Sequence, residues 1–567
     1  MASGGTTDLQ ARRRADLDKK PGKHGYSLLL KDSVIYGAGS TLQKFLMVFL
    51  MPLYTAYLTP ADYGVVGMVN VTAQFIYVFI NLGYDVTMSR FYFDDHSEVR
   101  RRQVIGTTFL AWTVYPAILL GLLIAFMPKL TPLLMGPGDY TLYFDLGMLN
   151  IFFTNWNSIP FMLMRLDHKP RLFTAFMIAR VIVQVSLSVL LVVVLDWGIY
   201  GVLVGTLVAS FVMNAASLPT YWRRISLKLD PKLMWAMTAF AFPALLNGAI
   251  FFVLKLSDRW FLMRYWGKTE VGLYTTAFQL SQPVYVAAAA FRMAWPQWHY
   301  AKLSKPTEHK QLVARSSTYF MVLSTILLVV MGVYMPLIVR VLLHKPSYWS
   351  VGPTAEVLAL STVIFGFYFV LWTGSNVAKK NRGLPLITVA ASALNLGLNF
   401  LLIPRFGMWA AAWTTVAGFA LLCILVYLLS RRHYPIPFEW GRLIRLTAAA
   451  ATTLAAGYAV AYLIGESVSM PFGTLVACAV IKTPVLLLFP LVLLLTGFFT
   501  AGEKAAATGA WARLRGRAVA VKPLFGAASP EHPADHLSAD DLAAEEEEVE
   551  IEGAAKSELS ESDQAGV

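Results

Sequence analysis

Apolar stretches and short polar links alternate along most of this chain, between Ser33 and Leu495. Each stretch holds about 19 to 26 residues, enough for a helix to cross a hydrocarbon core of roughly 30 Å. In lipid the backbone must satisfy its own hydrogen bonds, so such stretches are helices. The pattern predicts about fourteen membrane-spanning helices, near residues 33–55, 64–84, 104–127, 141–163, 172–195, 198–222, 238–263, 272–293, 315–339, 354–377, 384–403, 407–430, 442–464 and 471–497.

The composition favours the same fold class, an all-α polytopic membrane protein. The chain has 567 residues, of which 57 % are hydrophobic and 14 % charged, more apolar surface than a soluble protein can bury. Residues 1–31 are polar and basic, and no small-residue cleavage site follows the first apolar stretch, so we expect no cleavable signal. Cys423 and Cys478 lie within apolar stretches without metal-ligand spacing. We therefore expect no cofactor.

The positive charges predict an orientation. Of the 47 Lys and Arg residues, 35 lie in the two terminal segments and every second link, 6 lie in the other links, and 6 lie within apolar helices. Loops rich in Lys and Arg stay in the cytoplasm, so we expect both termini there. Residues 531–567 hold 13 acidic side chains and one basic one, which predicts a disordered tail. The basic residues before this tail suit anionic lipid headgroups, so membrane lipids rather than nucleic acid are the expected partner.

The two halves of the chain resemble each other. The run LTPADYG at 58–64 aligns with WGKTEVG at 266–272, an offset of 208 positions. The run DWGIYG at 196–201 aligns with RFGMWA at 405–410, an offset of 209. Six helices separate the matched segments, which predicts two parallel-repeat six-helix lobes around a central cavity, plus two extra C-terminal helices. The expected segments are a basic N-terminal segment (1–31), an N-lobe (32–230), a C-lobe (231–432), the extra helices (433–497) and a cytoplasmic tail (498–567).

Several runs resemble one family of membrane proteins. The runs are GAGS at 37–40, PLYTAYLTPADYG at 52–64, LGYDVTMSRFY at 82–92, SDR at 257–259 and VGLY at 271–274. Over roughly residues 33–495 the chain resembles the polysaccharide-unit flippases of the multidrug/oligosaccharidyl-lipid/polysaccharide exporter superfamily.

The resemblance implies transport without catalysis. Such proteins move undecaprenyl-pyrophosphate-linked oligosaccharides from the inner to the outer leaflet of the bacterial cytoplasmic (inner) membrane, for lipopolysaccharide or exopolysaccharide biosynthesis, by rocking two lobes around a cavity. The expected partners are the lipid-linked oligosaccharide and polysaccharide polymerase or export proteins. The resemblance leaves open whether a coupling cation, H⁺ or Na⁺, takes part.

Positive charges inside the apolar helices are the candidate site residues, because a cation costs about 2.5 to 3.5 kcal/mol at mid-bilayer and needs a partner or a hydrated cavity. A pyrophosphate headgroup is a suitable partner. Lys44, Arg180 and Arg292, with Arg90 at the end of the second helix, are therefore predicted to bind substrate, the alternatives being internal ion pairs, snorkelling and helix anchoring. Trp156, Trp295, Trp298, Asn155, Asn157, Gln279 and Gln282 are weaker candidates for contacts with sugar rings.

A second group lies near the outer end of the seventh predicted helix. Lys255, Asp258 and Arg259 are spaced three and four positions apart and share a face. They form either an internal salt bridge or a gate at which Asp258 takes up a cation or proton when its partner is drawn to substrate. Lys482 lies outside the repeat, which favours a structural partner. Asn395 and Asn399 share a face and are alternatively expected to bond neighbouring helices.

Two other functional classes were compared with a flippase. A multidrug exporter of the same superfamily would carry cationic drugs and favour acidic cavity groups, whereas these helices hold six cations and few acids, chiefly Asp258 and Asp145. An enzyme would need a nucleophile triad, a metal cluster or a phosphate-binding glycine loop, and the sequence shows none of them. We therefore expect the chain not to be an enzyme.

Overall fold

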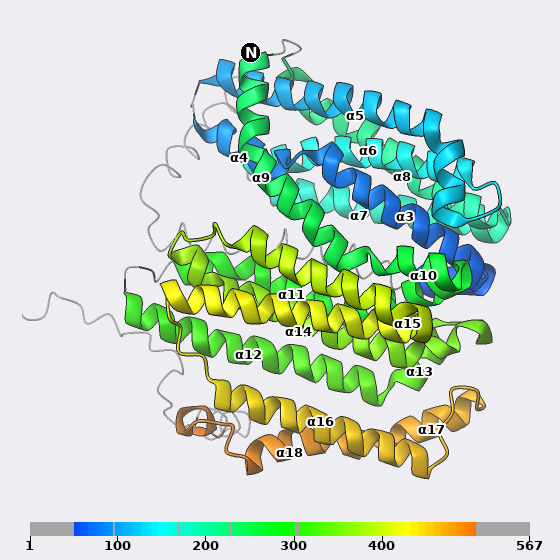
Figure 1. Ribbon diagram of the computed structural model, residues 1–567, viewed down its shortest axis with the longest axis vertical. Coiled ribbons are helices and arrows are strands. Elements are labelled where there is room, and N and C mark those ends of the chain that lie inside the picture. The colour runs from blue at the N-terminus through cyan, green and yellow to red at the C-terminus, as the bar shows by residue number, and fades with distance from the viewer. Residues whose placement is uncertain are drawn as a thin grey trace, which may run out of the picture. The chain divides into compact units, whose positions relative to one another are not determined.

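Helices make up nearly all of the computed structural model (Figure 1), which describes residues 50–94, 97–167, 169–226, 230–300, 303, 305–505 and 508. At positions 85, 86, 286–290, 292–294 and 296–300 it describes the backbone only. Among these residues there is no strand, and ten helices are long and apolar enough to cross a membrane. This confirms the expected fold class, whereas the number of fourteen spans stays a prediction. The first predicted span, near 33–55, lies almost wholly outside the described residues.

The first half of the described chain forms one group of packed helices. Its elements are α3 (Pro60–Asn81), α4 (Tyr84–Asp94), α5 (Glu98–Met135), α6 (Thr141–Leu166), α7 (Pro170–Ser188), η1 (Val189–Val194), α8 (Gly198–Tyr221) and η2 (Trp222–Arg224). α6 packs against α5 and α8, and α7 packs against α8. Thr59 caps α3: its side chain accepts from the Asp62 amide, and the Asp62 carboxylate accepts from the Thr59 amide. α3 therefore begins at a fixed residue.

The second half forms another group. Its elements are α9 (Pro231–Leu256), α10 (Asp258–Trp266), α11 (Lys268–Tyr300), α12 (Pro306–Val333), α13 (Met335–Leu342), η3 (Pro346–Val351), α14 (Gly352–Val377) and α15 (Leu384–His433). α14 packs against both α15 and α11. α15 covers the two spans predicted at 384–403 and 407–430. The helix kinks at Gly407, where φ is 55° and ψ is −137°.

α9 contacts both groups (Figure 1). In its first half, Thr238 forms a 2.8 Å hydrogen bond between its hydroxyl and that of Tyr84 in α4, and Ala241 faces Gly83. In its second half, Phe252 packs at a tilt against Phe75 of α3, and Phe251 stacks on Phe419 of α15. The boundary predicted at residue 230 thus precedes a helix whose first half packs on the N-terminal group and whose second half contacts both groups.

α3 and α11 join the two groups at one end of the bundle. A Cβ atom added at Gly64 would lie 1.8 Å from the carbonyl oxygen of Lys268, and one added at Gly272 would lie 1.8 Å from that of Pro60. Beside this crossing, Tyr63 donates a 2.6 Å hydrogen bond to Gln279, and Lys345 donates to the carbonyl oxygen of Leu58 at 3.2 Å. The crossing therefore brings the two backbones into direct contact.

Three further elements follow the second group: α16 (Trp440–Leu463), α17 (Phe472–Lys482) and α18 (Leu488–Leu495), with η4 (Thr483–Leu487) between the last two. α16 packs against α12 and α18, and α17 packs against α13. A separate compact unit begins at Gly497, and 497–505 and 508 are its described residues. The acidic tail predicted to be disordered lies outside the described residues.

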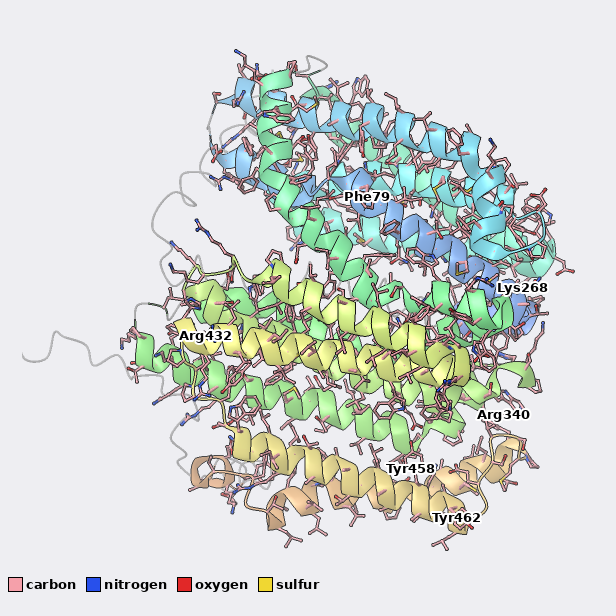
Figure 2. The ribbon with its side chains drawn as sticks, viewed as in Figure 1. Phe79, Lys268, Arg340, Arg432, Tyr458 and Tyr462 are labelled. Atoms are coloured by element: carbon pink, nitrogen blue, oxygen red, sulfur yellow. The ribbon has the colours of Figure 1, made fainter. Side chains whose placement is uncertain are left out.

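Large apolar side chains cover much of the outside of these helices. Leu133, Tyr462, Leu463 and Leu495 are 81 %, 87 %, 80 % and 78 % exposed. Side chains of this kind are stable in contact with lipid and costly in water. Figure 2 shows Lys268 and Arg340 near one end of the helices and Arg432 at the other, so each lies at a helix end where water and headgroups are accessible.

Candidate functional site

The clearest polar site in the described part of the chain lies where α9 gives way to α10. Asp258 is the first residue of α10, and its Oδ1 lies 3.0 Å from Nη1 of Arg259. The same oxygen accepts a 2.9 Å hydrogen bond from the Arg259 amide. The two side chains are 3 % and 2 % exposed, so this ion pair is fully buried. A buried pair of this kind is stable only if its remaining polar atoms are also satisfied.

Neighbouring helices supply those partners. Tyr274 of α11 donates a short hydrogen bond to Oδ2 of Asp258, and Thr415 of α15 donates to the same oxygen at 3.5 Å. The Arg259 guanidinium lies over the rings of Tyr274 and Phe278, at 5.1 and 4.7 Å from their centroids. Cation–π contacts of this kind stabilise a desolvated guanidinium. Three helices thus fix the position of one carboxylate.

A chain of amide and hydroxyl groups continues from this ion pair. Asn399 Nδ2 donates to Oδ1 of Asn395 at 3.1 Å and to Oγ of Ser257 at 3.5 Å, and its own Oδ1 accepts a short bond from Thr414. This confirms the expectation that Asn395 and Asn399 bond neighbouring helices. The buried Nδ2 of Asn395 has no acceptor among the described residues. The network can therefore donate a hydrogen bond to one further acceptor.

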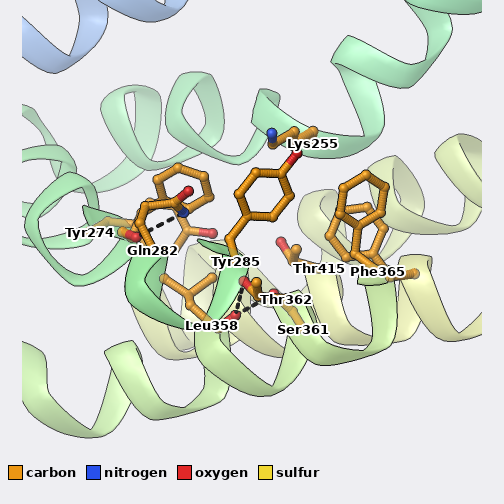
Figure 3. A pocket seen from close by; sticks show the side chains of 11 residues that line it. Lys255, Tyr274, Gln282, Tyr285, Leu358, Ser361, Thr362, Phe365 and Thr415 are labelled. Atoms are coloured by element: carbon orange, nitrogen blue, oxygen red, sulfur yellow. Dashed lines mark hydrogen bonds between the residues drawn. The ribbon is translucent and has the colours of Figure 1, made fainter. Parts of the chain in front are cut away.

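A small cavity adjoins the ion pair on the side of Tyr274 and Thr415 (Figure 3). The volume open to the centre of a water-sized sphere is about 20 Å³, which is room for one or two water molecules. Its walls combine aromatic rings with polar groups, namely Lys255, Tyr274, Phe278, Gln282, Tyr285, Leu358, Ser361, Thr362, Phe365, Thr415 and Phe419. Water can therefore be held next to the partners of Asp258.

Lys255 belongs to the cavity rather than to the ion pair. Its Nζ lies 5.7 Å from the ring centroid of Tyr285 and 5.9 Å from that of Phe365. The spacing predicts that Lys255, Asp258 and Arg259 share one face. In the structure, Lys255 lines the cavity together with Tyr274, the side chain that bonds Asp258. The predicted salt bridge exists between Asp258 and Arg259. The gating role of all three residues stays a prediction.

Arg180 is a candidate substrate-binding residue that the structure describes. It lies in α7, and its Nε is buried without a hydrogen-bond partner among the described residues. Tyr77 of α3 is near enough to interact with it electrostatically. The Tyr77 hydroxyl forms hydrogen bonds with Ser158 at 3.3 Å and Asn81 at 3.2 Å, so a polar patch extends from Arg180 onto two other helices.

Arg90 has a partner within the protein. Its guanidinium carbon lies 4.6 Å from the ring centroid of Phe240, so the exposed Arg90 side chain ties α4 to α9. This contact supports the anchoring alternative, and the predicted role in substrate binding stays a prediction. Lys44 lies outside the described residues, and so does the Arg292 side chain, although the backbone of Arg292 belongs to α11.

The described candidates for sugar contacts bond within the protein, whereas the Trp298 side chain lies outside the described residues. Trp156 donates to Thr113 at 3.1 Å, Trp295 donates to Thr373 at 2.9 Å, and Asn155 donates to the carbonyl oxygen of Trp112 at 3.3 Å. Gln279 accepts from Tyr63 at the helix crossing. Sequence reasoning missed Tyr274 and Thr415, because nothing in the spacing shows that α11 and α15 place hydroxyls on Asp258.

Many apolar helices with a buried ion pair among them define a multi-pass membrane protein. The family model "Polysaccharide biosynthesis protein" matches residues 56–343, and the chain belongs to this family. This confirms the resemblance found in the sequence.

The fold is shared with transporters whose structures are solved. A structure titled "Lipid II flippase MurJ, inward closed conformation" aligns with a TM-score of 0.64 and 12 % identity, over 85 % of this chain and 100 % of that chain. An inward-facing multidrug resistance MATE family transporter of the MOP superfamily aligns with a TM-score of 0.57 and 12 % identity, over 69 % of this chain and 94 % of that chain. At such identities the likeness shows the fold alone.

One curated relative matches over a short segment. The uncharacterized membrane protein MJ1068 of Methanocaldococcus jannaschii is 31 % identical over 107 residues, which is 19 % of this chain. The chain spans 21 % of the length of that relative in the alignment.

Proposed function

We propose that this protein is a flippase that moves undecaprenyl-pyrophosphate-linked oligosaccharide units across the bacterial inner membrane by alternating access. The observation that carries the proposal is Arg180, a guanidinium within an apolar helix whose buried Nε has no hydrogen-bond partner in the described part of the chain. A cation held in this way is suited to a phosphate-bearing headgroup. Membership in a polysaccharide biosynthesis family and the fold of a lipid II flippase support the same substrate class.

In this proposal Lys44, Arg90, Arg180 and Arg292 contact the pyrophosphate and glycan along the path of the substrate. Both termini lie in the cytoplasm, as the positive charges of alternate links indicate. The headgroup enters from the cytoplasmic leaflet, and the flipped unit is then available to polymerase or export proteins at the outer leaflet.

Asp258 is the proposed coupling group. In the described structure Arg259 neutralises it, and Tyr274 and Thr415 hold its second oxygen. If substrate draws Arg259 away, the carboxylate becomes free to take up a proton or Na⁺. The adjoining cavity is large enough for the water that such an ion would carry.

A reconstituted flipping assay tests the electrostatic part. The full chain is placed in liposomes that contain a fluorescent undecaprenyl-pyrophosphate oligosaccharide, and a membrane-impermeant quencher reports which leaflet holds the label. We expect Arg180→Ala to slow flipping roughly tenfold or more, because a hydrogen bond to a charged group contributes about 1.5–3 kcal/mol. Arg180→Lys should keep part of the rate, since it keeps the charge.

The matched control is Lys305→Ala, because Lys305 is 70 % exposed and pairs with the neighbouring Glu308 at the protein surface. Unchanged flipping by the triple variant Lys44→Ala, Arg180→Ala and Arg292→Ala would disprove the cationic binding path. Multidrug export, the alternative, predicts instead that a deletion strain becomes sensitive to cationic drugs without accumulating lipid-linked glycan.

A further inference from the structure

Three ionisable side chains meet where α16 and α17 pack on the second helix group. Glu356 comes from the first turns of α14, Glu466 from the link between α16 and α17, and Lys482 is the last residue of α17. None of the three is a residue that the proposed function uses. We refer to them as the Glu356–Glu466–Lys482 cluster.

Lys482 holds Glu466 and the C-terminal end of α12. Its Nζ lies 2.6 Å from Oε2 of Glu466 and donates a 2.6 Å hydrogen bond to the carbonyl oxygen of Val333. The Lys482 and Glu466 side chains are 3 % and 1 % exposed. This confirms the expectation that Lys482 has a structural partner. The ion pair is buried among apolar helices, where an uncompensated charge is costly.

Glu356 lies in the same cluster without a cation of its own. Tyr458 of α16 (labelled in Figure 2) donates a short hydrogen bond to its Oε2. No described Lys or Arg lies within ion-pair distance of Glu356, but Lys482 is near enough to interact with it electrostatically. The Glu356 carboxylate therefore shares the single ammonium that already neutralises Glu466.

The charges of the cluster do not balance when both carboxylates are ionised, since two negative charges meet one positive charge. The buried Oε1 of Glu466 also has no hydrogen-bond partner among the described residues, so the site lacks a donor. One added proton on either carboxylate balances the charge of the cluster. An alkali cation fits less well, because the Lys482 ammonium 2.6 Å from Glu466 would repel it.

We propose that the Glu356–Glu466–Lys482 cluster binds one proton, that the proton resides on Glu356 beside Tyr458, and that it keeps α16 and α17 docked on the second helix group. The other titratable group that faces the cluster is Tyr334, whose hydroxyl lies 2.9 Å from that of Thr483, next to Lys482. Loss of the proton leaves a second carboxylate competing for Lys482, which weakens the contact between these helices. The site is independent of which substrate the protein carries.

Infrared difference spectroscopy on the purified full-length protein tests the proposal. A protonated carboxyl gives a C=O stretching band that shifts in D₂O and disappears when the group ionises. We expect this band in the wild type at neutral pH and its loss in Glu356→Gln. Tyr458→Phe, a mild change, should shift the band by removing its hydrogen-bond donor, and this variant keeps the test valid if Glu356→Gln does not fold.

Glu308→Gln is the matched control, because Glu308 is 53 % exposed and paired with Lys305 at the protein surface. It should leave the band unchanged. Three results would overturn the proposal: a wild-type protein without the band, a band that persists in Glu356→Gln but is lost in Glu466→Gln, or a band that Na⁺ abolishes at constant pH.

Discussion

Gly64 of α3 and Gly272 of α11 lie against each other's helices in reciprocal contacts. A Cβ atom added at Gly64 would lie 1.8 Å from the carbonyl oxygen of Lys268, and one added at Gly272 would lie 1.8 Å from that of Pro60. The two glycines are 208 positions apart in the sequence, and so are Pro60 and Lys268. The contacts are thus related by the offset of the predicted repeat, as a two-fold axis between two lobes would require.

Gly64→Ala and Gly272→Ala should each separate this crossing. A methyl group cannot fit 1.8 Å from a backbone oxygen, so the helices must move apart, and overpacking of this kind costs about 1–3 kcal/mol. We expect a lower Tm of the purified protein and slower flipping, because both helices meet at one end of the bundle. Gly473→Ala is the control, since no atom lies within 4 Å of a Cβ added there. Equal Tm values for Gly64→Ala and Gly473→Ala would contradict the contact.

The Asp258–Arg259 pair should behave as a single unit in stability measurements. Arg259→Leu leaves a carboxylate buried without its cation, which destabilises a protein by about 3–5 kcal/mol. The double variant Asp258→Asn, Arg259→Leu removes the charge as well, so we expect most of the lost Tm to return. Thermal unfolding in detergent provides the measurement. A double variant that is less stable than Arg259→Leu would show that Asp258 interacts mainly with another group.

The kink in α15 depends on Gly407 and Glu270. Gly407 has a φ of 55° and ψ of −137°, which a residue with a side chain adopts only with strain of order 1–3 kcal/mol. After the kink, the Met408 amide donates a 3.1 Å hydrogen bond to Oε1 of Glu270 in α11. We expect Gly407→Ala and Glu270→Ala to lower the Tm, and Glu270→Gln to keep it near the wild-type value. A similar loss of Tm in Glu270→Ala and Glu270→Gln would rule out Glu270 as the acceptor that holds the Met408 amide.

Much of the fold could be predicted because apolar length and link charge are local properties of the sequence. Each predicted span after the first falls on one helix or on consecutive helices, and the break between the spans predicted at 384–403 and 407–430 falls beside the kink at Gly407. The partners of Asp258 could not be predicted, because Tyr274 and Thr415 reach it only after three helices pack. Glu466 was missed for another reason: topology prediction depends on Lys and Arg, so an acid in the short link between α16 and α17 carries no signal.

Asp230 gives a pH-dependent test of the N-terminus of α9, the helix that contacts both helix groups. It is the N-cap of α9, and its carboxylate accepts hydrogen bonds from the amides of Leu233 and Lys232 and lies 3.4 Å from Nη1 of Arg100 in α5. The Leu233 amide above all, then the Lys232 amide and Arg100, lower the pKa of Asp230 below its ordinary value. The ionised form therefore stabilises the folded protein.

A lowered folded-state pKa means that this stabilisation is present above the unfolded-state pKa of about 3.9 and is lost as the pH falls through the folded-state value. Asp230→Asn keeps a capping side chain but removes the charge. We expect its Tm to lie below that of the wild type at neutral pH, and the difference to shrink as the pH falls below about 4. Thermal unfolding in detergent across this pH range measures the effect. Arg100→Gln should lower the Tm by a smaller amount, because Arg100 contributes less than the two amides. A Tm difference between Asp230→Asn and the wild type that grows as the pH falls would contradict the lowered pKa of Asp230.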